Sequence, residues 1–216
     1  MNPALFQKFI SDYTILKEVD FVPEISLYQA SDITPIWQAT ENWLAEQNIE
    51  PPFWAFAWPG GKALARYIID HPRFVKQKKV LDFAAGCGIA AIAAGKNNAQ
   101  FIEVADIDPL AQQACASNAK VNHILLDKNS KNIVGLPCQW DLIICGDVCY
   151  EAPMTRHIWP WLKKCAATGA QVIIADPGRN YLPKEELFPI HEYNIPTTME
   201  LEDCTSRHTI LYQLTL

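Results

Sequence analysis

The stretch Val80-Leu81-Asp82-Phe83-Ala84-Ala85-Gly86-Cys87-Gly88 decides the fold of this chain of 216 residues. Its apolar residues predict a buried strand, and its two glycines allow a tight turn that a bound nucleotide can approach closely. Small residues over 89–96 then predict a helix that packs closely on the sheet. A second strand ends at Asp106, 20 residues after Gly86, the separation at which a βαβ unit brings a carboxylate to a ribose. The stretch therefore predicts an α/β fold that binds a nucleotide-type cofactor.

Asp82 distinguishes between the two classes of cofactor that use this geometry. The pattern Gly86-x-Gly88-x-x-Ala91 also fits the dinucleotide fingerprint. A carboxylate four residues before the first glycine would repel a pyrophosphate, however, and would attract the cationic amino group of a methionine tail. An NAD-linked oxidoreductase is therefore the weakest alternative, and tight binding of NAD would revive it.

With these residues the stretch resembles the class I S-adenosylmethionine (SAM) methyltransferases, whose first strand carries the motif Asp/Glu-x-Gly-x-Gly. The motif is matched here by Asp82, Ala84, Gly86 and Gly88, with alanine at a position where glycine is more usual. The resemblance implies SAM as the cofactor and adds Asp106 and Ile107 to the cofactor-binding residues. It also implies a Rossmann-like, mostly parallel seven-stranded sheet with helices on both faces and a C-terminal antiparallel hairpin, for which the alternating residues 206–216 are suited.

Composition limits the class of protein and its partners. Half of the residues are hydrophobic, and the net charge is −6 at pH 7 without a cluster of Lys and Arg, which argues against binding to nucleic acid or to an anionic membrane. The seven cysteines form no CxxC pair and lie mostly in apolar runs, so we expect reduced core thiols and no metal site. Because the sequence shows neither a signal peptide nor an apolar run of membrane-spanning length, we expect a cytoplasmic protein.

We interpret residues 1–216 as a single methyltransferase domain, with 1–50 as a helical extension over the cofactor cleft and 51–216 as the catalytic core. Within the extension, apolar residues recur with a helix-like period over 3–18, and a second helix is predicted over 35–47. A short strand is predicted between these two helices, over 25–28.

An aromatic run, Phe53-Trp54-Ala55-Phe56-Ala57-Trp58, precedes Pro59-Gly60-Gly61 and a helix that leads to the glycine-turn strand. A segment at this place lies beside the cofactor cleft in a sheet of this type. We therefore expect Trp58 and Gly60 to line the cleft, although a packing role for both is an equal alternative.

Further strands and helices are predicted downstream. A helix is predicted over 110–121, and Asn118 and Asn122, one turn apart, can be plain surface residues. The apolar residues 123–126 predict the third strand, and the polar residues 127–132 predict a loop.

Two apolar strands deliver polar groups at their carboxyl ends. The strand that begins after Trp140 ends at Asp147 and Tyr150, and the strand over 171–176 is followed by Arg179. A carboxylate such as Asp147 can bind and orient a substrate ammonium, as an anchor or as a base, and Tyr150 can add a hydrogen bond and a ring face. Both are our candidate catalytic residues. Glu151 is a weaker candidate, and Asp176 with Arg179 can equally brace the cleft, bind substrate or form a structural ion pair.

Four segments together carry a narrower resemblance: residues 53–61, 106–109, 146–151 and 175–183. They resemble the seven-strand protein-lysine methyltransferases, most closely the electron transfer flavoprotein β-subunit lysine methyltransferases. In that family an acid-x-x-aromatic motif after the fourth strand lies at the catalytic centre, and it maps to Asp147 and Tyr150. The resemblance implies methylation of lysine in a protein such as the electron transfer flavoprotein β-subunit.

Two other functions stay open at this point. The chain can be a small-molecule amine N-methyltransferase, which could use the same acid and aromatic residue. It can also be a non-catalytic SAM-binding partner protein. In each case we expect a monomer that binds neither nucleic acid nor membrane.

Overall fold

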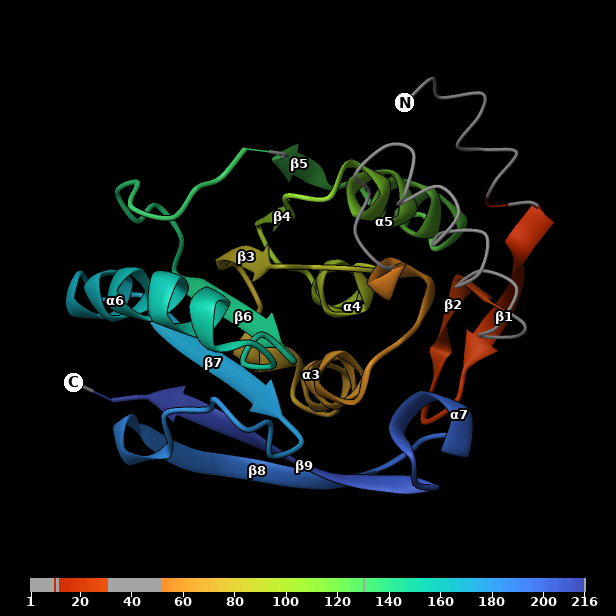
Figure 1. Ribbon diagram of the computed structural model, residues 1–216. Helices are drawn as coiled ribbons and strands as arrows, with labels where there is room; N and C mark the ends of the chain where they lie inside the picture. Colours follow the sequence, from red (N-terminus) through yellow and green to blue (C-terminus); the bar gives the residue numbers. More distant parts are fainter. Residues whose placement is uncertain (1–9, 11, 31–51, 130, 216) are drawn as a thin grey trace, which may run out of the picture.

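The computed structural model describes residues 10, 12–30, 52–129 and 131–215 (Figure 1). Its centre is a seven-stranded sheet of order β5-β4-β3-β6-β7-β9-β8. The parallel strands are β3 (Lys79–Phe83), β4 (Phe101–Ala105), β5 (Asp127–Asn129), β6 (Leu142–Gly146) and β7 (Gln171–Asp176). The hairpin of β8 (Leu187–Pro196) and β9 (Ser206–Leu214) completes the sheet, and β9 runs antiparallel to both of its neighbours. The predicted Rossmann-like fold class, with its C-terminal hairpin, is confirmed.

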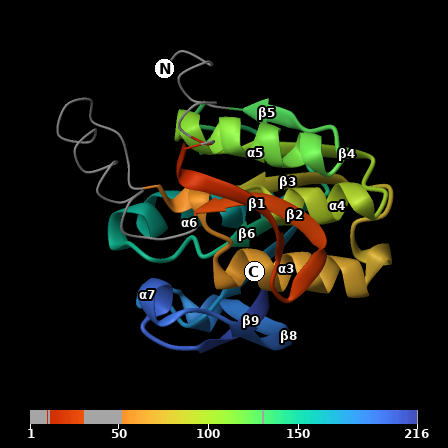
Figure 2. The ribbon, with the colours of Figure 1, turned by 90° about the vertical axis from the view of Figure 1, so that its right-hand side faces the viewer.

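Helices cover both faces of the sheet (Figures 1 and 2). One face carries α3 (Pro59–Asp70), α4 (Ile89–Lys96) and α5 (Pro109–Val121), and the other carries α6 (Ala152–Ala167). The small residues of α4 pack closely on the sheet, as predicted, because every residue from Ile89 to Ala94 is buried. Each face has its own apolar core, so the carboxyl ends of β3, β6 and β7 are held rigidly between the two.

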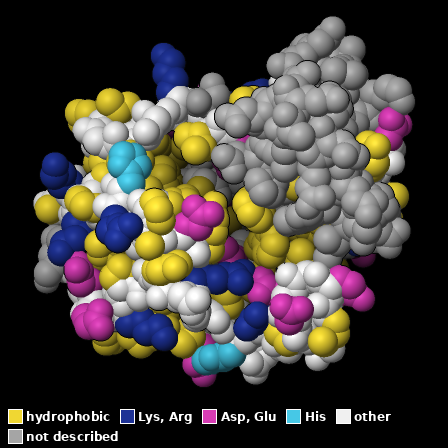
Figure 3. Space-filling view, viewed as in Figure 1, with side chains coloured by type: hydrophobic (Ala, Val, Ile, Leu, Met, Phe, Trp, Pro, Cys, Tyr) yellow, Lys and Arg dark blue, Asp and Glu magenta, His cyan; other side chains and the backbone are white. Residues whose placement is uncertain are grey.

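Short helices connect the larger elements. The 3-10 helices η1 (Phe53–Ala55), η2 (Pro72–Phe74) and η3 (Lys184–Glu186) lie between the larger elements, and α7 (Met199–Glu202) connects β8 to β9. None of the helices in the described ranges has the length and apolar character needed to cross a membrane. On the face seen in Figure 3, basic and acidic side chains are interspersed.

The N-terminal segment agrees with the prediction only in part: residues 10, 12 and 13 are helical as expected, and the residues that follow them are not. Residues 14–18, expected to be helical, belong to strand β1 (Thr14–Val19), which pairs antiparallel with β2 (Val22–Ala30). The helix-like period was misleading at its end because Leu16, its last apolar position, is exposed rather than buried. The strand predicted over 25–28 lies within β2 and is confirmed, and the helix predicted over 35–47 lies outside the described residues.

The third strand of the parallel sheet also differs from the prediction. Residues 123–126 are not a strand, and Leu125 is almost fully exposed. The strand is β5, formed by three residues that we expected in a polar loop, and it pairs with Glu103 to Ala105 of β4. Backbone hydrogen bonds place an edge strand without help from apolar side chains. The side-chain amide of Asn129 also donates to Glu103 Oε1 at 2.9 Å, so polar contacts hold this edge in register.

Asn118 and Asn122 of α5 are buried, contrary to the interpretation as surface residues. Their side chains act as the hydrogen-bonding partners of β2: Asn118 Oδ1 accepts from Tyr28 N at 2.9 Å, and Asn122 Oδ1 accepts from Ser26 N at 3.2 Å. Asn122 Nδ2 donates back to Ser26 O at 2.6 Å. These contacts attach the N-terminal hairpin to α5, and ion pairs of Lys62 and Arg66 with Asp20 and Glu24 attach it to α3. Figure 2 shows the hairpin lying across the face that carries these helices.

Candidate active site

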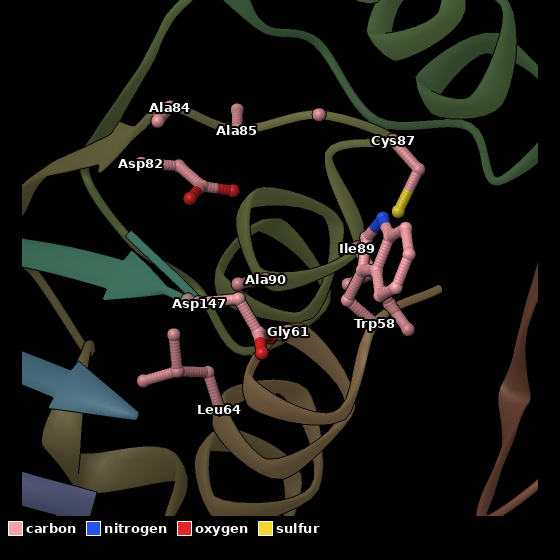
Figure 4. Close-up of a pocket in the computed structure, with 12 residues that line it drawn as sticks. Trp58, Gly61, Leu64, Asp82, Ala84, Ala85, Cys87, Ile89, Ala90 and Asp147 are labelled. Atoms are coloured by element: carbon pink, nitrogen blue, oxygen red, sulfur yellow. The ribbon is translucent and has the colours of Figure 1, made fainter. Parts of the chain in front are cut away.

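A pocket lies where the carboxyl ends of β3 and β6 meet the first turns of α3 and α4 (Figure 4). Two carboxylates line it: Asp82 from the strand that enters the glycine turn, and Asp147 from the residue after β6. The remaining lining residues are small or apolar except for one indole. They are Trp58, Gly61, Leu64, Ala84, Ala85, Gly86, Cys87, Ile89, Ala90 and Gly146.

The glycine turn has the left-handed backbone that its sequence predicts. Gly86 has φ 53° and Gly88 has φ 75°, and a Cβ at Gly88 would lie 3.0 Å from Cys115 Sγ. Ala84 also has a positive φ of 54°, so the alanine at the unusual motif position adopts a conformation that glycine adopts without strain. The turn leaves its backbone open toward the pocket, as a nucleotide-type ligand requires.

Asp82 is almost fully buried, and its Oδ2 accepts a hydrogen bond from Ala91 N at 2.9 Å. Burial is the main cause that raises the pKa of this carboxyl to about 8, and the charge of Asp106 adds to it. A buried carboxyl of this kind becomes ionised most readily when a cation lies beside it. The site therefore suits a ligand that carries an amino group.

Asp106 lies against the glycine turn rather than on the lining of the pocket. Its Oδ2 accepts from Gly86 N at 2.9 Å and its Oδ1 from Asp108 N at 3.0 Å, while burial raises its pKa. This contact places the carboxylate at the point where the βαβ unit was expected to deliver it. The neighbouring Ile107 is 73% exposed, so its expected contact with the cofactor rests on its position beside Asp106 alone.

Trp58 lines the pocket, and its Nε1 donates to Phe53 O at 2.8 Å, which fixes the indole. Gly60 is in the first turn of α3 and acts through its backbone: Gly60 N donates to Asp147 Oδ2 at 2.6 Å. A Cβ at Gly60 would collide with this carboxylate and with the carbonyl oxygen of Ala175. Glycine at position 60 is thus required for Asp147 to lie where it does.

Asp147 is buried and has a positive φ of 55°, with Asp147 N donating to Ala175 O at 3.0 Å. Its Oδ1 accepts from Arg179 Nη2 at 2.9 Å. Burial raises the pKa of Asp147 to about 6, against the lowering effect of the Arg179 charge and hydrogen bond. Sequence reasoning found the carboxylate but missed both partners, since Gly60 and Arg179 are distant from it in the chain.

Tyr150 is 41% exposed and does not line the pocket. Its ring lies 5.6 Å from the ring of Phe53, and Phe53 in turn lies 5.9 Å from Trp58. A continuous set of aromatic rings therefore connects Tyr150 to the pocket. Glu151 is exposed, in agreement with the weaker role that we gave it.

Asn118 is a residue of the site that the sequence reasoning did not select. Its Nδ2 donates to Cys87 O at 2.9 Å, the carbonyl between the two glycines of the turn. The available signal was two asparagines one turn apart, at the end of an alanine-rich helix and directly after it. Among the described residues, no cluster of His, Cys, Asp or Glu could hold a metal ion.

Comparison with known proteins identifies the family of the chain. The family model of the ribosomal protein L11 methyltransferases (PrmA) matches residues 66–175. The electron transfer flavoprotein beta subunit lysine methyltransferase of Xenopus laevis is 33% identical over 205 residues, which cover 91% of this chain and 82% of that protein. The protein of the same name from Danio rerio is 35% identical over 208 residues, covering 91% of this chain and 78% of that protein.

Solved structures support the fold. Ribosomal protein L11 methylase from Lactobacillus delbrueckii subsp. bulgaricus has a TM-score of 0.52 at 19% identity, covering 74% of this chain and 81% of that chain. Magnesium protoporphyrin IX methyltransferase from Synechocystis PCC 6803, solved with bound SAM, has a TM-score of 0.54 at 11% identity, covering 83% and 93%. By its sequence and its fold, the chain belongs to the class I SAM-dependent methyltransferases, in the family of the electron transfer flavoprotein beta subunit lysine methyltransferases.

Proposed function

We propose that this chain methylates lysine side chains of the electron transfer flavoprotein β-subunit, with SAM as the methyl donor. The proposal rests on the shared length and identity with the vertebrate enzymes of that name. The observation that carries it is the pair of carboxylates, Asp82 and Asp147, which line one pocket from the ends of two neighbouring strands. One carboxylate is available for the amino group of the cofactor and the other for the amino group of the substrate.

The residues that would hold SAM fit its chemistry. The open backbone of the turn from Ala84 to Gly88 suits the nucleoside, Asp106 at that turn suits the ribose hydroxyls, and the buried Asp82 suits a cationic amino group. Trp58 and Ile107 complete the cofactor-binding residues that we propose. Trp58 lines the pocket with its indole, and Ile107 offers an exposed apolar side chain beside Asp106. Gly60 contributes indirectly, since it fixes Asp147.

The acceptor needs positioning more than acid catalysis. SAM supplies an electrophilic methyl group on a sulfonium, and transfer to a neutral amine gives a methylammonium and S-adenosylhomocysteine. The substrate ammonium must lose one proton to solvent before it attacks. With a pKa of about 6, Asp147 is ionised at neutral pH and can bind and orient this ammonium, while Tyr150 offers a hydroxyl and a ring face beside it.

The decisive test uses the purified β-subunit of the electron transfer flavoprotein from the same organism. Labelled SAM and the chain should transfer label to this subunit, and mass spectrometry of peptides should locate it on lysine. Asp147→Asn, which keeps the shape of the side chain, should strongly reduce transfer, to a residual rate that can still be measured, while SAM binding is retained. Ribosomal protein L11 serves as the comparison substrate, because the L11 methyltransferase model also matches this chain.

Three other results would replace the proposed substrate or the proposed activity. Label in L11 alone would exchange the proposed substrate for L11. Label in small amines alone would indicate a small-molecule N-methyltransferase, and binding of both SAM and the β-subunit without any transfer would indicate a non-catalytic partner protein.

We further propose a cytoplasmic, monomeric enzyme. All seven cysteines are free thiols and five of them are buried, which fits a reducing compartment. Light scattering of the purified chain tests the monomer, and fractionation of cells tests the compartment.

A further inference from the structure

Asp147 is one end of a chain of alternating charges that extends away from the pocket. Arg179 Nη2 contacts both Asp147 Oδ1, at 2.9 Å, and Glu202 Oε1, at 2.5 Å. Arg179 Nη1 adds a second contact to Glu202, to Oε2 at 3.1 Å. Arg207 closes the chain, with its Nε 2.9 Å from Glu202 Oε2 and its Nη2 2.8 Å from Glu202 O.

The geometry points to Arg179 as the positioning residue of Asp147, with Glu202 and Arg207 as the support that holds Arg179 in place. This inference rests on the proposed role of Asp147 as the group that binds the substrate ammonium. Arg179 itself does not line the pocket, so its effect on the reaction passes through the carboxylate.

The local backbone directs Arg179 toward Asp147. Asp176, the last residue of β7, accepts from Gly178 N at 2.7 Å and from Arg179 N at 2.6 Å through its Oδ1. Gly178 has φ 90°, a value that favours glycine, and it turns the chain back over the strand end. The turn between β7 and η3 therefore presents the guanidinium to the residue after the neighbouring strand β6.

Because Asp147 is buried, it needs Arg179 as an ion-pair partner. The side chain of Asp147 is 11% exposed and that of Glu202 is 2% exposed, so neither carboxylate is stabilised by water. Asp176 brings a third negative charge close to Asp147, and its Oδ2 is buried without a hydrogen-bond partner among the described residues. Without Arg179, the like charges of Asp147 and Asp176 would remain in one buried corner, and Asp147 would hold a proton in place of the substrate ammonium.

The groups that face Asp147 come from three elements. Gly60 N donates from α3, Arg179 and Asp176 lie after and at the end of β7, and the Cys149 thiol lies in the same loop as Asp147. Arg179 is the only cation among them. Arg179 donates to Asp147 Oδ1 through Nη2 and also through Nε, at 3.3 Å, and Gly60 N donates to Oδ2. Since a carboxylate offers about four lone-pair positions, one position on Oδ2 is left for a further donor.

The contact with Glu202 also explains why arginine is present at position 179. A planar guanidinium can contact two carboxylates at once through separate nitrogens, whereas a lysine ammonium is a single point charge. Arg179→Lys should therefore restore the charge beside Asp147 but not the double contact.

The first experiment follows the ionisation of Asp147 directly, without a protein substrate. Carbon-13-labelled aspartate in the full chain, assigned with Asp147→Asn, gives the carboxyl pKa by NMR. Arg179→Gln should raise the pKa of Asp147 by about 1–3 pH units. With Arg179→Lys, the pKa of Asp147 should stay close to its value in the parent chain. Arg207→Gln should raise the pKa of Asp147 by less. Arg66 of α3, which pairs with Glu24 and Asp70, provides the control, and Arg66→Gln should not change this pKa.

The second experiment measures kcat/KM for the β-subunit against pH. The inflection that belongs to Asp147, near pH 6 in the parent chain, should move upward in Arg179→Gln by the same amount as the NMR pKa. In the Asp147→Asn background, Arg179→Gln should cause no further loss, because Arg179 acts through Asp147.

The outcomes separate this inference from the proposed function. An unchanged Asp147 pKa in folded Arg179→Gln, or additive losses in the double variant, would overturn the role of Arg179. A shifted pKa in a chain whose parent form transfers no methyl group to any protein would leave the ion pair in place and overturn the substrate proposal instead.

Discussion

The side-chain amide of Asn118 joins two parts of the molecule by donating to the carbonyl of Cys87 at 2.9 Å. The oxygen of the same amide accepts from Tyr28 N at 2.9 Å, so α5 links the N-terminal hairpin to the turn between Gly86 and Gly88. A fully buried amide with both ends engaged fixes both partners at once. The shape of the glycine turn therefore depends on a residue that does not line the pocket.

Asn118→Ala should weaken SAM binding as well as stability. The loss leaves Tyr28 N and Cys87 O without this partner, which costs about 1–3 kcal/mol for each buried group. For a chain of this length about 2 kcal/mol corresponds to a fall in Tm of roughly 4–8 °C. Thermal melts and calorimetry with SAM measure both effects.

Asn97 provides the matched control for this prediction. Asn97 directly follows α4, and its Nδ2 donates to Ala93 O of that helix at 2.9 Å, so it does not connect separate elements. Asn97→Ala should leave the affinity for SAM unchanged. Equal losses of affinity in the two variants would show that the link between hairpin and turn has no effect on the cofactor.

Asp82→Asn should stabilise the protein at alkaline pH and weaken SAM binding. Burial raises the pKa of Asp82 to about 8, from an ordinary value of about 4. Between these values the folded state holds a proton that the unfolded state releases, so the free energy of unfolding falls as pH rises from about 4 to about 8. Asparagine keeps an acceptor for Ala91 N and removes the titration.

The measurement is a series of thermal melts between pH 5 and pH 8, with calorimetry for SAM. The advantage of Asp82→Asn over the parent chain should be larger at pH 8, where about 1–2 kcal/mol corresponds to roughly 2–8 °C. SAM affinity should fall at least about tenfold, the loss expected for a charged hydrogen bond. A variant whose advantage is the same at both pH values would contradict the raised pKa.

Gly60→Ala should reduce turnover more strongly than its effect on stability alone explains. The added methyl group meets the carboxylate of Asp147 and the carbonyl oxygen of Ala175, neither of which can move without displacing a strand end. A misplaced positioning group costs about 100-fold in rate. Steady-state kinetics on the β-subunit, with melts on the same samples, measure this.

The neighbouring glycine gives the comparison. At Gly61 an added Cβ would lie 3.1 Å from a methyl group of the Ile89 side chain, which can adjust. Gly61→Ala should therefore lose less activity than Gly60→Ala. The reverse order would mean that the contact between Gly60 and Asp147 does not position the carboxylate.

Ala84→Gly should stabilise the protein. A left-handed conformation costs an alanine about 1–2 kcal/mol, whereas the greater freedom of glycine in the unfolded chain costs about 0.4–1 kcal/mol. The balance favours glycine at φ 54° by up to about 1.6 kcal/mol. Denaturant titration checks this, and Ala85→Gly, at a residue without a positive φ, should destabilise the chain instead.

The features that could be predicted from sequence are those with local signals. The apolar run before Gly86, the spaced glycines and the acid at Asp106 lie within one βαβ unit, so their spacing alone fixes their arrangement. The carboxyl ends of β6 and β7 were likewise located from apolar runs. Asp147 was found because a polar residue directly follows such a run.

The features that were missed depend on contacts between distant residues. Arg179 pairs with Asp147, 32 positions away, and nothing in either segment marks the other. The exposed Leu16 imitates a helical period, and β5 forms from polar residues because its neighbour β4 supplies the hydrogen bonds. In each of these cases tertiary contacts override the local pattern.

The two edges of the seven-stranded sheet restrict how another protein can bind. At one edge β5 has only three residues, and at the other β8 contains Pro189 and Pro196, which cannot donate to an added strand. Both edges are thus protected against strand addition and against the aggregation that follows from it. We therefore expect a substrate protein to be recognised without strand addition, by the loops at the carboxyl ends of the strands, with its target lysine on a surface that those loops can reach.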